Sequence, residues 1–324
     1  MSRRIRAWTT IVPIIVALAA CGGAVQSGAP ASAEPGRPER AAITVGTLPI
    51  TDVAALHLAV DAGLFEAEGL TVTPEIMQGG AAAIPALQGG DLDIAFGAWP
   101  SFLIANQRGI PLRAVADGVA ATPGNTEFLA MPDSGLEGDP GAMRGTTVAI
   151  NTLGNLGELA LRATLADAGL DYADVTAVEI PFPEMAAALE GGSVDVIWAV
   201  EPALTAARAD VGAVTVVDSY LDEMEGFPVA GYFVTAEFAE RNPNTVAAFR
   251  RAIEAAADML NDDPELRVEV VRGYTEVPQA LLEQIVFPEF RGRVEIAELE
   301  RVYEYMIDFG MIEEGLDLRS VILD

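Results

Sequence analysis

Lysine is absent from this chain of 324 residues, histidine and cysteine occur once each, and 19 basic residues face 48 acidic ones. The resulting net charge of −29 repels nucleic acid and anionic lipid headgroups, so neither is an expected partner. A single cysteine excludes internal disulfides. With one histidine and no spare thiol, nucleophilic triads and Cys/His metal sites have no partners.

These absences predict a protein that is not an enzyme and that carries no cofactor or metal. His57 stands between two leucines in a helical stretch, where a packing role is expected. Asp91 and Asp93 lie on a turn and the strand after it, where we expect them to cap and solubilise rather than to act as general acid and base. Two explanations of the acidic surface stay open, which are a compositional bias of the genome and an adaptation to strong brine.

The first residues have the layout of an export signal. Three arginines precede an apolar stretch at 11–18, and the four residues that end at Cys21 resemble a bacterial lipobox. We therefore expect a signal peptide at 1–20, lipidation of Cys21, and an extracytoplasmic protein held to the cell membrane by its lipid. Residues 21–41 contain Gly, Ala, Ser, Pro and charge with few large apolar side chains, which predicts a flexible tether.

The rest of the chain contains an internal duplication. In the longest pair of matched segments, six of fifteen positions are identical without a gap. Each copy contains a strand, a helix, a second strand, an Ala-rich helix that ends at Gly-Gly, and a third strand, which predicts two α/β units with parallel sheets. The matched segments are 86–100 with 188–202, 44–48 with 147–151, and 61–64 with 167–170.

The segments outside the two copies suggest how the halves connect. Residues 128–131 and 227–234 have the pattern of strands, and helices are expected at 245–260, 278–287 and 296–309. The simplest arrangement has two crossings between the lobes and packs the C-terminal helices on the first. We therefore predict that residues 42–132 and 228–324 form lobe 1 and that residues 133–227 form lobe 2.

Several motifs, in this order, resemble the nitrate, taurine, sulfonate and thiamine-precursor group of periplasmic binding proteins. The resemblance implies a type II fold in which two α/β lobes, joined by a two-crossing hinge, close on a small ligand. It also implies delivery of the ligand to the permease and ATPase subunits of an ABC importer. We expect the protein to be a monomer. The motifs are 62–70, 89–93, 198–202 and 231–235.

Ligands of parallel α/β sheets collect beyond the carboxyl ends of the strands, which defines the candidate residues here. Trp99 and Glu201 hold equivalent positions in the two copies, so Trp99 is the expected stacking surface and Glu201 the expected acceptor. Alternatively, Trp99 fills the core and Glu201 complements a helix dipole, and Trp198 is expected in the core. The full set is Thr51, Asp52, Gly80, Trp99, Asn125, Thr152, Asn155, Glu184, Glu201 and Tyr232.

The expected ligand is a small neutral or cationic organic molecule, such as a nitrogen heterocycle of the thiamine- or flavin-precursor type. Helix N-termini at these loops suit an anion. However, the loops contain no arginine, and Asp52, Glu184 and Glu201 would face an anion without compensation. An aliphatic sulfonate, taurine or nitrate is the alternative, and an enzyme on the same fold, such as a pyrimidine-precursor synthase, comes last.

Overall fold

The structure is a computed structural model that describes residues 36–77, 79–220, 224–275 and 277–323. The predicted signal peptide, Cys21 and the tether up to residue 35 lie outside the described residues. Glu39, which the sequence analysis assigned to the tether, is instead bound to the folded body. Its carboxylate accepts hydrogen bonds from the Asn244 and Thr245 N–H groups (3.0 Å each), at the start of helix α9 (Pro243–Asp262).

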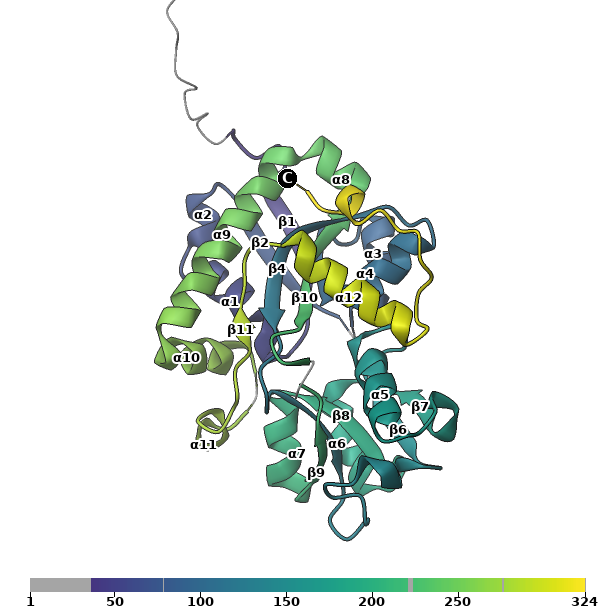
Figure 1. Cartoon of the computed structure of the whole chain (residues 1–324). Helices are drawn as coiled ribbons and strands as arrows, with labels where there is room; N and C mark the ends of the chain where they lie inside the picture. Colours follow the sequence, from purple (N-terminus) through teal and green to yellow (C-terminus); the bar gives the residue numbers. More distant parts are fainter. Residues whose placement is uncertain (1–35, 78, 221–223, 276, 324) are drawn as a thin grey trace, which may run out of the picture. The chain divides into compact units, whose positions relative to one another are not determined.

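The first sheet has six strands in the order β11-β4-β10-β3-β1-β2 (Figure 1). β1 pairs in parallel with β2 and β3, whereas β10 is antiparallel to β3 and β4. Nearly every residue of β3 and β10 is buried, as expected of central strands covered on both faces. The strands are β1 (Ala42–Thr47), β2 (Thr71–Ile76), β3 (Ile94–Ala98), β4 (Leu112–Ala120), β10 (Pro228–Thr235) and β11 (Glu289–Phe290).

The second sheet has five strands in the order β7-β6-β8-β5-β9. β6 pairs in parallel with β7 and β8, and β5 is antiparallel to β8 and β9. The two orders correspond strand for strand once the edge strand β11 is set aside. The strands are β5 (Thr126–Ala130), β6 (Thr147–Ile150), β7 (Thr176–Glu179), β8 (Val196–Val200) and β9 (Val214–Asp218).

The pairing register confirms the duplication predicted from sequence. Val45 pairs with Ile94 in the first sheet, and their equivalents Val148 and Val196 pair in the second. The outer strands agree as well, because β1 and β2 pair in the same register as β6 and β7. Two α/β lobes, each built on one copy, are therefore present as expected.

One predicted boundary is wrong. The strand predicted at 128–131 falls in the predicted lobe 1, yet β5, which forms there, pairs with β8 and β9 and lies inside the second sheet. The first crossing therefore runs through 121–125, before β5 rather than after it. The second crossing lies between the end of β9 at Asp218 and the start of β10 at Pro228. The crossings are bonded to each other, since the Ala121 N–H donates to the Phe227 carbonyl (2.8 Å).

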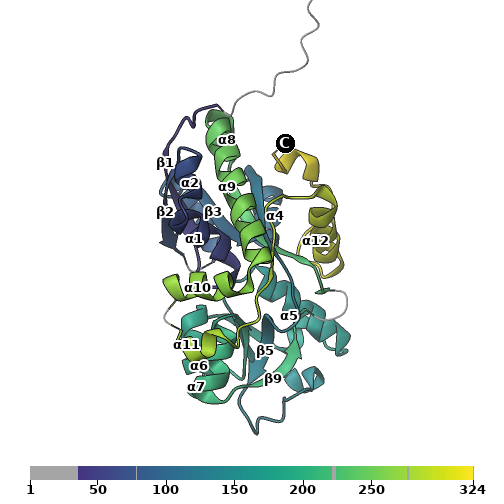
Figure 2. The ribbon, with the colours of Figure 1, turned by 90° about the vertical axis from the view of Figure 1, so that its left-hand side faces the viewer.

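The helices of lobe 1 form two layers that sandwich the first sheet. α1, α2, α9 and α10 pack together, and α3, α4 and α12 form the other layer (Figures 1 and 2). The remaining short helices are α8, beside β10, and α11, which contacts α7. Their bounds are α1 (Ala54–Asp61), α2 (Leu64–Ala67), α3 (Gly80–Gly89), α4 (Trp99–Gln107), α8 (Ala236–Arg241), α10 (Pro264–Tyr274), α11 (Gln279–Leu282) and α12 (Ile296–Asp308).

The C-terminal helices agree with two of the three predictions. α9 and α12 form where helices were expected, but only 279–282 of the predicted helix at 278–287 is helical. α10 was not predicted. It begins at Pro264, which cannot continue α9 because it has no N–H group, and the Asp263 carboxylate caps it by accepting from the Glu265 N–H (3.0 Å).

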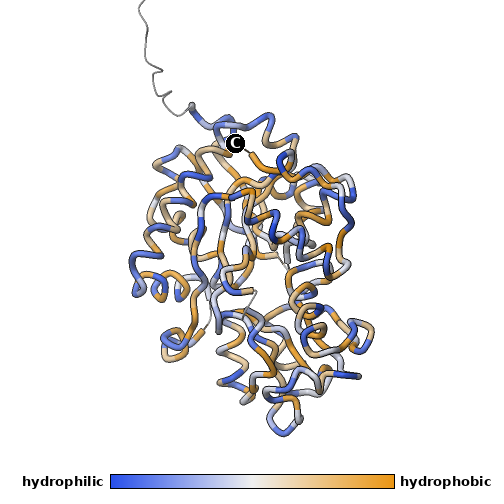
Figure 3. The backbone as a smooth tube through the Cα atoms, viewed as in Figure 1, coloured by the Kyte–Doolittle hydropathy of each residue, from blue (hydrophilic) through white to orange (hydrophobic). Residues whose placement is uncertain are grey.

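Lobe 2 has three α-helices among its described residues: α5 (Leu156–Asp167), α6 (Phe182–Glu190) and α7 (Ala203–Val211). Hydrophobic residues concentrate in the strands of both sheets, whereas peripheral helices such as α10 carry hydrophilic ones (Figure 3). Among the described helices, none is both long and apolar enough to cross a membrane.

Candidate functional site

A small cavity lies between the lobes, at the carboxyl ends of β1, β3, β6 and β8. Its volume of about 30 Å³ suits roughly one or two water molecules, so an organic ligand requires the lobes to separate. The lining is largely apolar and aromatic with few polar groups, as is usual for small-molecule sites. Lobe 1 contributes Leu48, Ile50, Asp52, Phe96, Gly97, Ala98, Val229 and Ala230, and lobe 2 contributes Asn151, Asn155, Leu156, Phe182, Trp198, Val200 and Tyr220.

The duplication accounts for much of this lining. Residues at equivalent positions of the two copies meet across the cavity, because each lobe presents the same strand ends to the other. The site therefore consists of two surfaces related by pseudo-symmetry, and they differ mainly in the side chains at equivalent positions. The equivalent pairs are Leu48 with Asn151, Asp52 with Asn155, Phe96 with Trp198, and Ala98 with Val200.

Among the described residues of the lining, Asp52 is the only carboxylate. It lies in a 3₁₀ turn (Thr51–Val53) that follows β1 and leads into α1, where the helix dipole favours an acid. The side chain is 4% exposed, and the Thr51 hydroxyl donates to its Oδ1 at 3.3 Å. Burial raises the pKa of the Asp52 carboxyl to about 7, against the weaker opposing effect of that hydrogen bond.

Aromatic side chains from both lobes surround the cavity. Phe182 and Trp198 contact each other with ring centroids 6.0 Å apart, and the Trp198 Nε1–H donates to Ser219 Oγ (3.1 Å). Gly157 of α5 makes room for the indole, since a Cβ atom at this position would lie 2.7 Å from Trp198 Cε3. The tryptophan is therefore fixed by its neighbours before any ligand arrives.

The polar part of the lining comes from the loop between β6 and α5. Asn155 caps α5, because its Oδ1 accepts from the Leu156 N–H (2.7 Å). The Asn155 Nδ2 group donates to Asn151 Oδ1 and to Thr152 Oγ1, both at 3.1 Å. These bonds fix the amide orientations of the two asparagines that line the cavity.

Hydrogen bonds between the lobes hold the cavity closed. The Thr51 N–H donates to the Glu201 carbonyl (3.0 Å), and Ser101 Oγ donates to the Gly154 carbonyl (2.9 Å). At the edge of the interface, an Arg162 guanidinium N–H donates to the carbonyl of Phe309, just after α12 (3.3 Å). The structure is therefore a closed form.

Glu201 acts inside this interface rather than in the cavity lining. Its carboxylate accepts from the Thr205 hydroxyl (2.7 Å) and N–H (3.1 Å), and from the Val286 N–H at 3.5 Å. Val286 belongs to the segment between α11 and β11, so the contact joins lobe 2 to the C-terminal part of lobe 1. Burial raises the pKa of the Glu201 carboxyl to about 7, partly offset by the Thr205 bonds.

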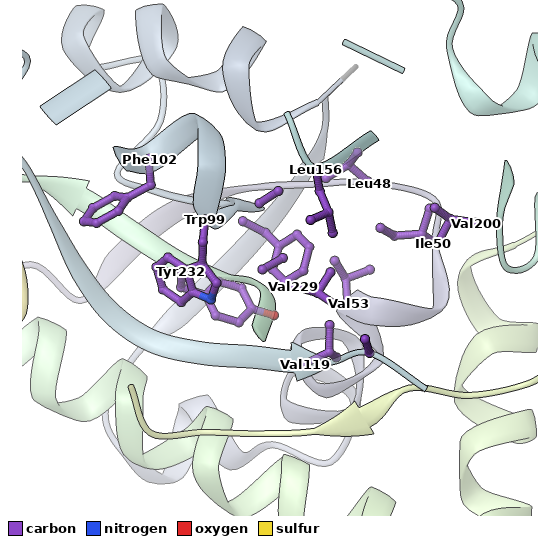
Figure 4. Close-up of a cluster of buried hydrophobic side chains, with 14 of the residues drawn as sticks. Leu48, Ile50, Val53, Trp99, Phe102, Val119, Leu156, Val200, Val229 and Tyr232 are labelled. Carbon is purple, nitrogen blue, oxygen red and sulfur yellow. The ribbon is translucent and has the colours of Figure 1, made fainter. Parts of the chain in front are cut away.

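Trp99, the first-choice stacking residue of the sequence analysis, lies in the core of lobe 1. It is 1% exposed, does not line the cavity, and its Nε1–H donates to Asp117 Oδ1 (3.3 Å). Figure 4 shows it beside Phe102 and Tyr232, apart from the cavity-lining Leu48, Ile50, Leu156 and Val200. Because the indole packs against lobe 1 and offers no free face, we leave Trp99 out of the candidate site.

The other predicted residues divide into three groups. Asp52 and Asn155 line the cavity. Thr51, Thr152 and Asn125 lie next to it; the Asn125 Nδ2 group donates to the Val286 carbonyl (2.8 Å) beside the Glu201 contact.

Glu184 and Tyr232 form the third group, away from the lining, and Gly80 is placed only by its element. Gly80 begins α3, and Glu184 is exposed on the first turn of α6. Tyr232 is buried in the first sheet, where its ring meets the edge of Phe96. Its hydroxyl has no hydrogen-bond partner among the described residues.

Sequence reasoning missed the aromatic wall of the cavity. Phe96 and Trp198 lie inside apolar strands, and Trp198 was expected in the core. The alignment of the copies contained the relevant signal, because these two large residues occupy equivalent positions three residues before the Trp99 and Glu201 pair.

His57 has the packing role expected of it. Its ring stacks on Tyr274 with centroids 3.9 Å apart and planes 9° from parallel. Burial lowers the pKa of the imidazole to about 4, against the opposing charge of Asp61, so the ring is neutral at pH 7. Within the described ranges no cluster of His, Cys, Asp and Glu is arranged to hold a metal ion.

Comparison with known proteins places this architecture in a family. Residues 36–273 match the model of the NMT1-like family. The chain belongs to that family. A relative in Brucella abortus (strain 2308), named only as a binding protein, is 24% identical over 233 residues, which cover 70% of this chain and 69% of the relative.

Solved structures show the same fold as this NMT1-like protein. The alkanesulfonate-binding protein of Xanthomonas axonopodis pv. citri, bound to MOPS, superposes with a TM-score of 0.76 at 19% identity and covers 88% of this chain and 99% of its own. The periplasmic nitrate-binding protein of Synechocystis PCC 6803 gives a TM-score of 0.73 at 15% identity, over 88% and 86%. A desulfurization enzyme also shares the fold, with a TM-score of 0.62 at 18% identity, over 87% and 96%. The fold is therefore that of two-lobed periplasmic binding proteins.

Proposed function

We propose that this protein is the solute-binding subunit of an ABC importer, which captures a small organic ligand by closing its lobes. The carrying observation is the cavity lined by equivalent residues of two duplicated lobes and closed by hydrogen bonds between them. A ligand that contacts both surfaces favours the closed form over the open one. Family membership and the binding proteins of the same fold support this function.

The ligand we propose is neutral or cationic, such as a nitrogen heterocycle of the thiamine- or flavin-precursor type. Among the described residues of the lining, none is an arginine or a histidine, and Asp52 would repel an anion. An aliphatic sulfonate, taurine or nitrate is the second candidate, because the N-terminus of α5 reaches the cavity. Its first N–H, on Leu156, already donates to Asn155, which weakens this candidate.

We further propose that the protein works outside the cytoplasm as a monomer, anchored through lipid on Cys21, with a permease and an ATPase as partners. The order of basic residues, apolar stretch and lipobox-like motif supports the anchor. The periplasmic nitrate-binding protein of the same fold supports the location. Membrane fractionation of cells that produce the full chain tests the anchor, which fails if the protein stays soluble.

We propose binding rather than catalysis, although the desulfurization enzyme shows that the fold also supports an enzyme. The cavity lining has no cysteine and no histidine among its described residues, and its one carboxylate has no second acid facing it. A nucleophile with an adjacent base is therefore missing from the lining. A turnover assay with any identified ligand separates the two classes, since a receptor returns it unchanged.

Native mass spectrometry of the purified protein, paired with small-angle scattering, tests the proposed function. A receptor gives a stoichiometric small-molecule complex, and the complex has a smaller radius of gyration than the stripped protein because closure compacts it. If no small molecule from a cell extract binds, or if binding leaves the radius unchanged, the protein is not a receptor that closes on its ligand.

A further inference from the structure

Asp52 occupies an unusual position for an acid. It is buried, it lines the cavity, and within the described part of the chain no ion pair includes it. Most other buried acids have partners: Glu127 pairs with Arg208 (2.6 Å), and Asp93 pairs with Arg40 (2.8 Å). A buried carboxylate without a cation is costly, because neither solvent nor a counter-charge compensates it.

The neighbours of Asp52 do not supply that counter-charge. Among the described residues, the Thr51 hydroxyl is the one side chain that hydrogen-bonds to the carboxylate, at a long 3.3 Å. The buried Tyr220 and Tyr232 and the partly buried Tyr274 have raised pKa values, first because of desolvation and then because of the negative charge of Asp52. Phenol groups near a carboxylate can offer weak polar contacts but no positive charge. The negative charge of Asp52 is therefore not compensated by these neighbours.

The cavity beside Asp52 is suited to a cation in another respect. Phe96, Phe182, Trp198 and Tyr220 all contribute aromatic side chains to the lining, and Trp198 is held in place by Gly157 and Ser219. Aromatic faces attract organic cations through their quadrupoles, most strongly where water is excluded. An anionic or purely apolar ligand would gain nothing from this combination of an unpaired carboxylate and aromatic walls.

Position within the duplication isolates the role of Asp52. Its equivalent in lobe 2 is Asn155, which also lines the cavity but is fully used in bonds to Leu156, Asn151 and Thr152. At this equivalent position, lobe 2 therefore has a neutral amide whose hydrogen bonds are satisfied, Asn155, and lobe 1 has an acid without an ion-pair partner, Asp52. The asymmetry lies in charge alone.

We propose that Asp52 is the counter-ion of the ligand, which is a compact organic cation such as an amine or a protonated nitrogen heterocycle with its charged nitrogen against this carboxylate. The inference rests on the proposed function and narrows it, because it excludes neutral and anionic ligands. The rest of the lining then contacts the carbon skeleton, and lobe closure removes water from the ion pair.

The test fractionates a small-molecule cell extract by ion exchange into cationic, neutral and anionic pools, and measures the melting temperature of the full-length protein with each. We expect only the cationic pool to stabilise the wild type. Asp52→Asn, which keeps the shape and removes the charge, should weaken binding of the active cation about tenfold or more. Calorimetry with the purified active compound measures this loss.

Asp117→Asn is the matched control. Asp117 is also a buried acid of lobe 1, is bonded to Trp99, and does not line the cavity, so its variant should keep the response to the cationic pool. Stabilisation of the wild type by the neutral or anionic pool alone overturns the inference and leaves the receptor function intact. Failure of all three pools overturns both. Equal cation affinity in the wild type and Asp52→Asn also overturns the inference.

Discussion

Trp99 and Trp198 show that two tryptophans in similar sequence surroundings can have different locations, one in the core and one at the cavity. Trp99 and Trp198 both follow or lie in a buried strand, and each packs closely on a glycine, Gly231 and Gly157 respectively. Trp99 donates to an acid inside lobe 1, whereas Trp198 borders the cavity. The chemical character of the residues gave no hint of this difference. It depends on a register offset of three positions along equivalent strands.

Gly157→Ala should disturb the site through Trp198. The added Cβ would lie 2.7 Å from Cε3, so the indole must move, and we expect a net loss of about 1–3 kcal/mol in unfolding free energy despite the better helix propensity of alanine. Urea unfolding and tryptophan emission measure the effect. Gly89→Ala in α3 is the control, because its Cβ meets only Asp91 Oδ2 at 3.5 Å, and it should be as stable as the wild type. Unchanged emission and stability in Gly157→Ala would contradict the packing described.

Stability should fall as pH rises through the weakly acidic range. Burial raises the pKa values of Asp52, Asp117 and Glu201 to about 7, far above those of the unfolded chain near about 4. Folding therefore retains protons that the unfolded chain releases, and stability present at about pH 4 is progressively lost up to about pH 7. Around Asp52, the facing titratable groups are Tyr220, Tyr232 and Tyr274, which stay neutral over this range.

Urea unfolding of the stripped protein between about pH 5 and about pH 8 measures this dependence, and Asp52→Asn should flatten it. A wild type that becomes more stable with rising pH would show that these acids are ionised and compensated in the folded state.

Asp52 and Asn155 could be predicted as cavity residues because both follow the first strand of a copy, and parallel strands place such loops at the ligand edge. Phe182 and Tyr220 could not. Tyr220 comes from the second crossing, and its place at the cavity depends on the distant pairing of β9 with β5. The sequence predicts which loops lie at the cavity, but tertiary packing determines which other side chains complete its lining.

At the level of elements, the sequence predicts where strands form but not which strands pair with each other. The apolar run at 128–131 correctly predicts a strand. No local feature of this run indicates whether the strand belongs to the first sheet or to the second. The ladder with β8, from Thr126 opposite Val200 to Ala130 opposite Val196, is a long-range contact. The boundary error of the sequence analysis has this origin.

The junction of α9 and α10 was missed for a different reason. The sequence analysis expected a helix at 245–260 and none directly after it, although a capping acid before proline at Asp263-Pro264 is a local signal for a new helix. Asp263→Ala should lower the unfolding free energy by about 1 kcal/mol, because two N–H groups of α10 lose their acceptor. Chemical denaturation measures it. The neighbouring Asp262→Ala, at the C-terminal end of α9, should be neutral, and equal effects of both variants would argue against the cap.

For the whole molecule, the balance between open and closed forms depends on a few bonds across the interface. Ser101→Ala removes the donor to the Gly154 carbonyl, a contact between lobes worth about 1 kcal/mol. We expect a larger radius of gyration for the stripped variant and about fivefold weaker ligand binding, since the closed form becomes less populated. Small-angle scattering and calorimetry measure both.

Ser320→Ala provides the comparison for that experiment. Its hydroxyl donates to the Asp317 carbonyl (2.6 Å) within lobe 1, so the same loss of one hydroxyl leaves the interface intact. If the two serine variants change the radius and the affinity alike, the contact at Gly154 does not control closure.

The central strands have a consequence for the integrity of the chain. β5 follows the first copy in sequence yet completes the second sheet, and β10 follows the second copy yet completes the first. The protein is in this sense a strand-exchanged dimer fused into one polypeptide. Cutting it between the copies would yield two fragments, each with a gap in the middle of its sheet and a spare strand that fits only the other. The fragments should fold by finding each other. Lobe 1 cannot be excised as one continuous segment, because residues 126–218, which contain every strand of the second sheet, interrupt it.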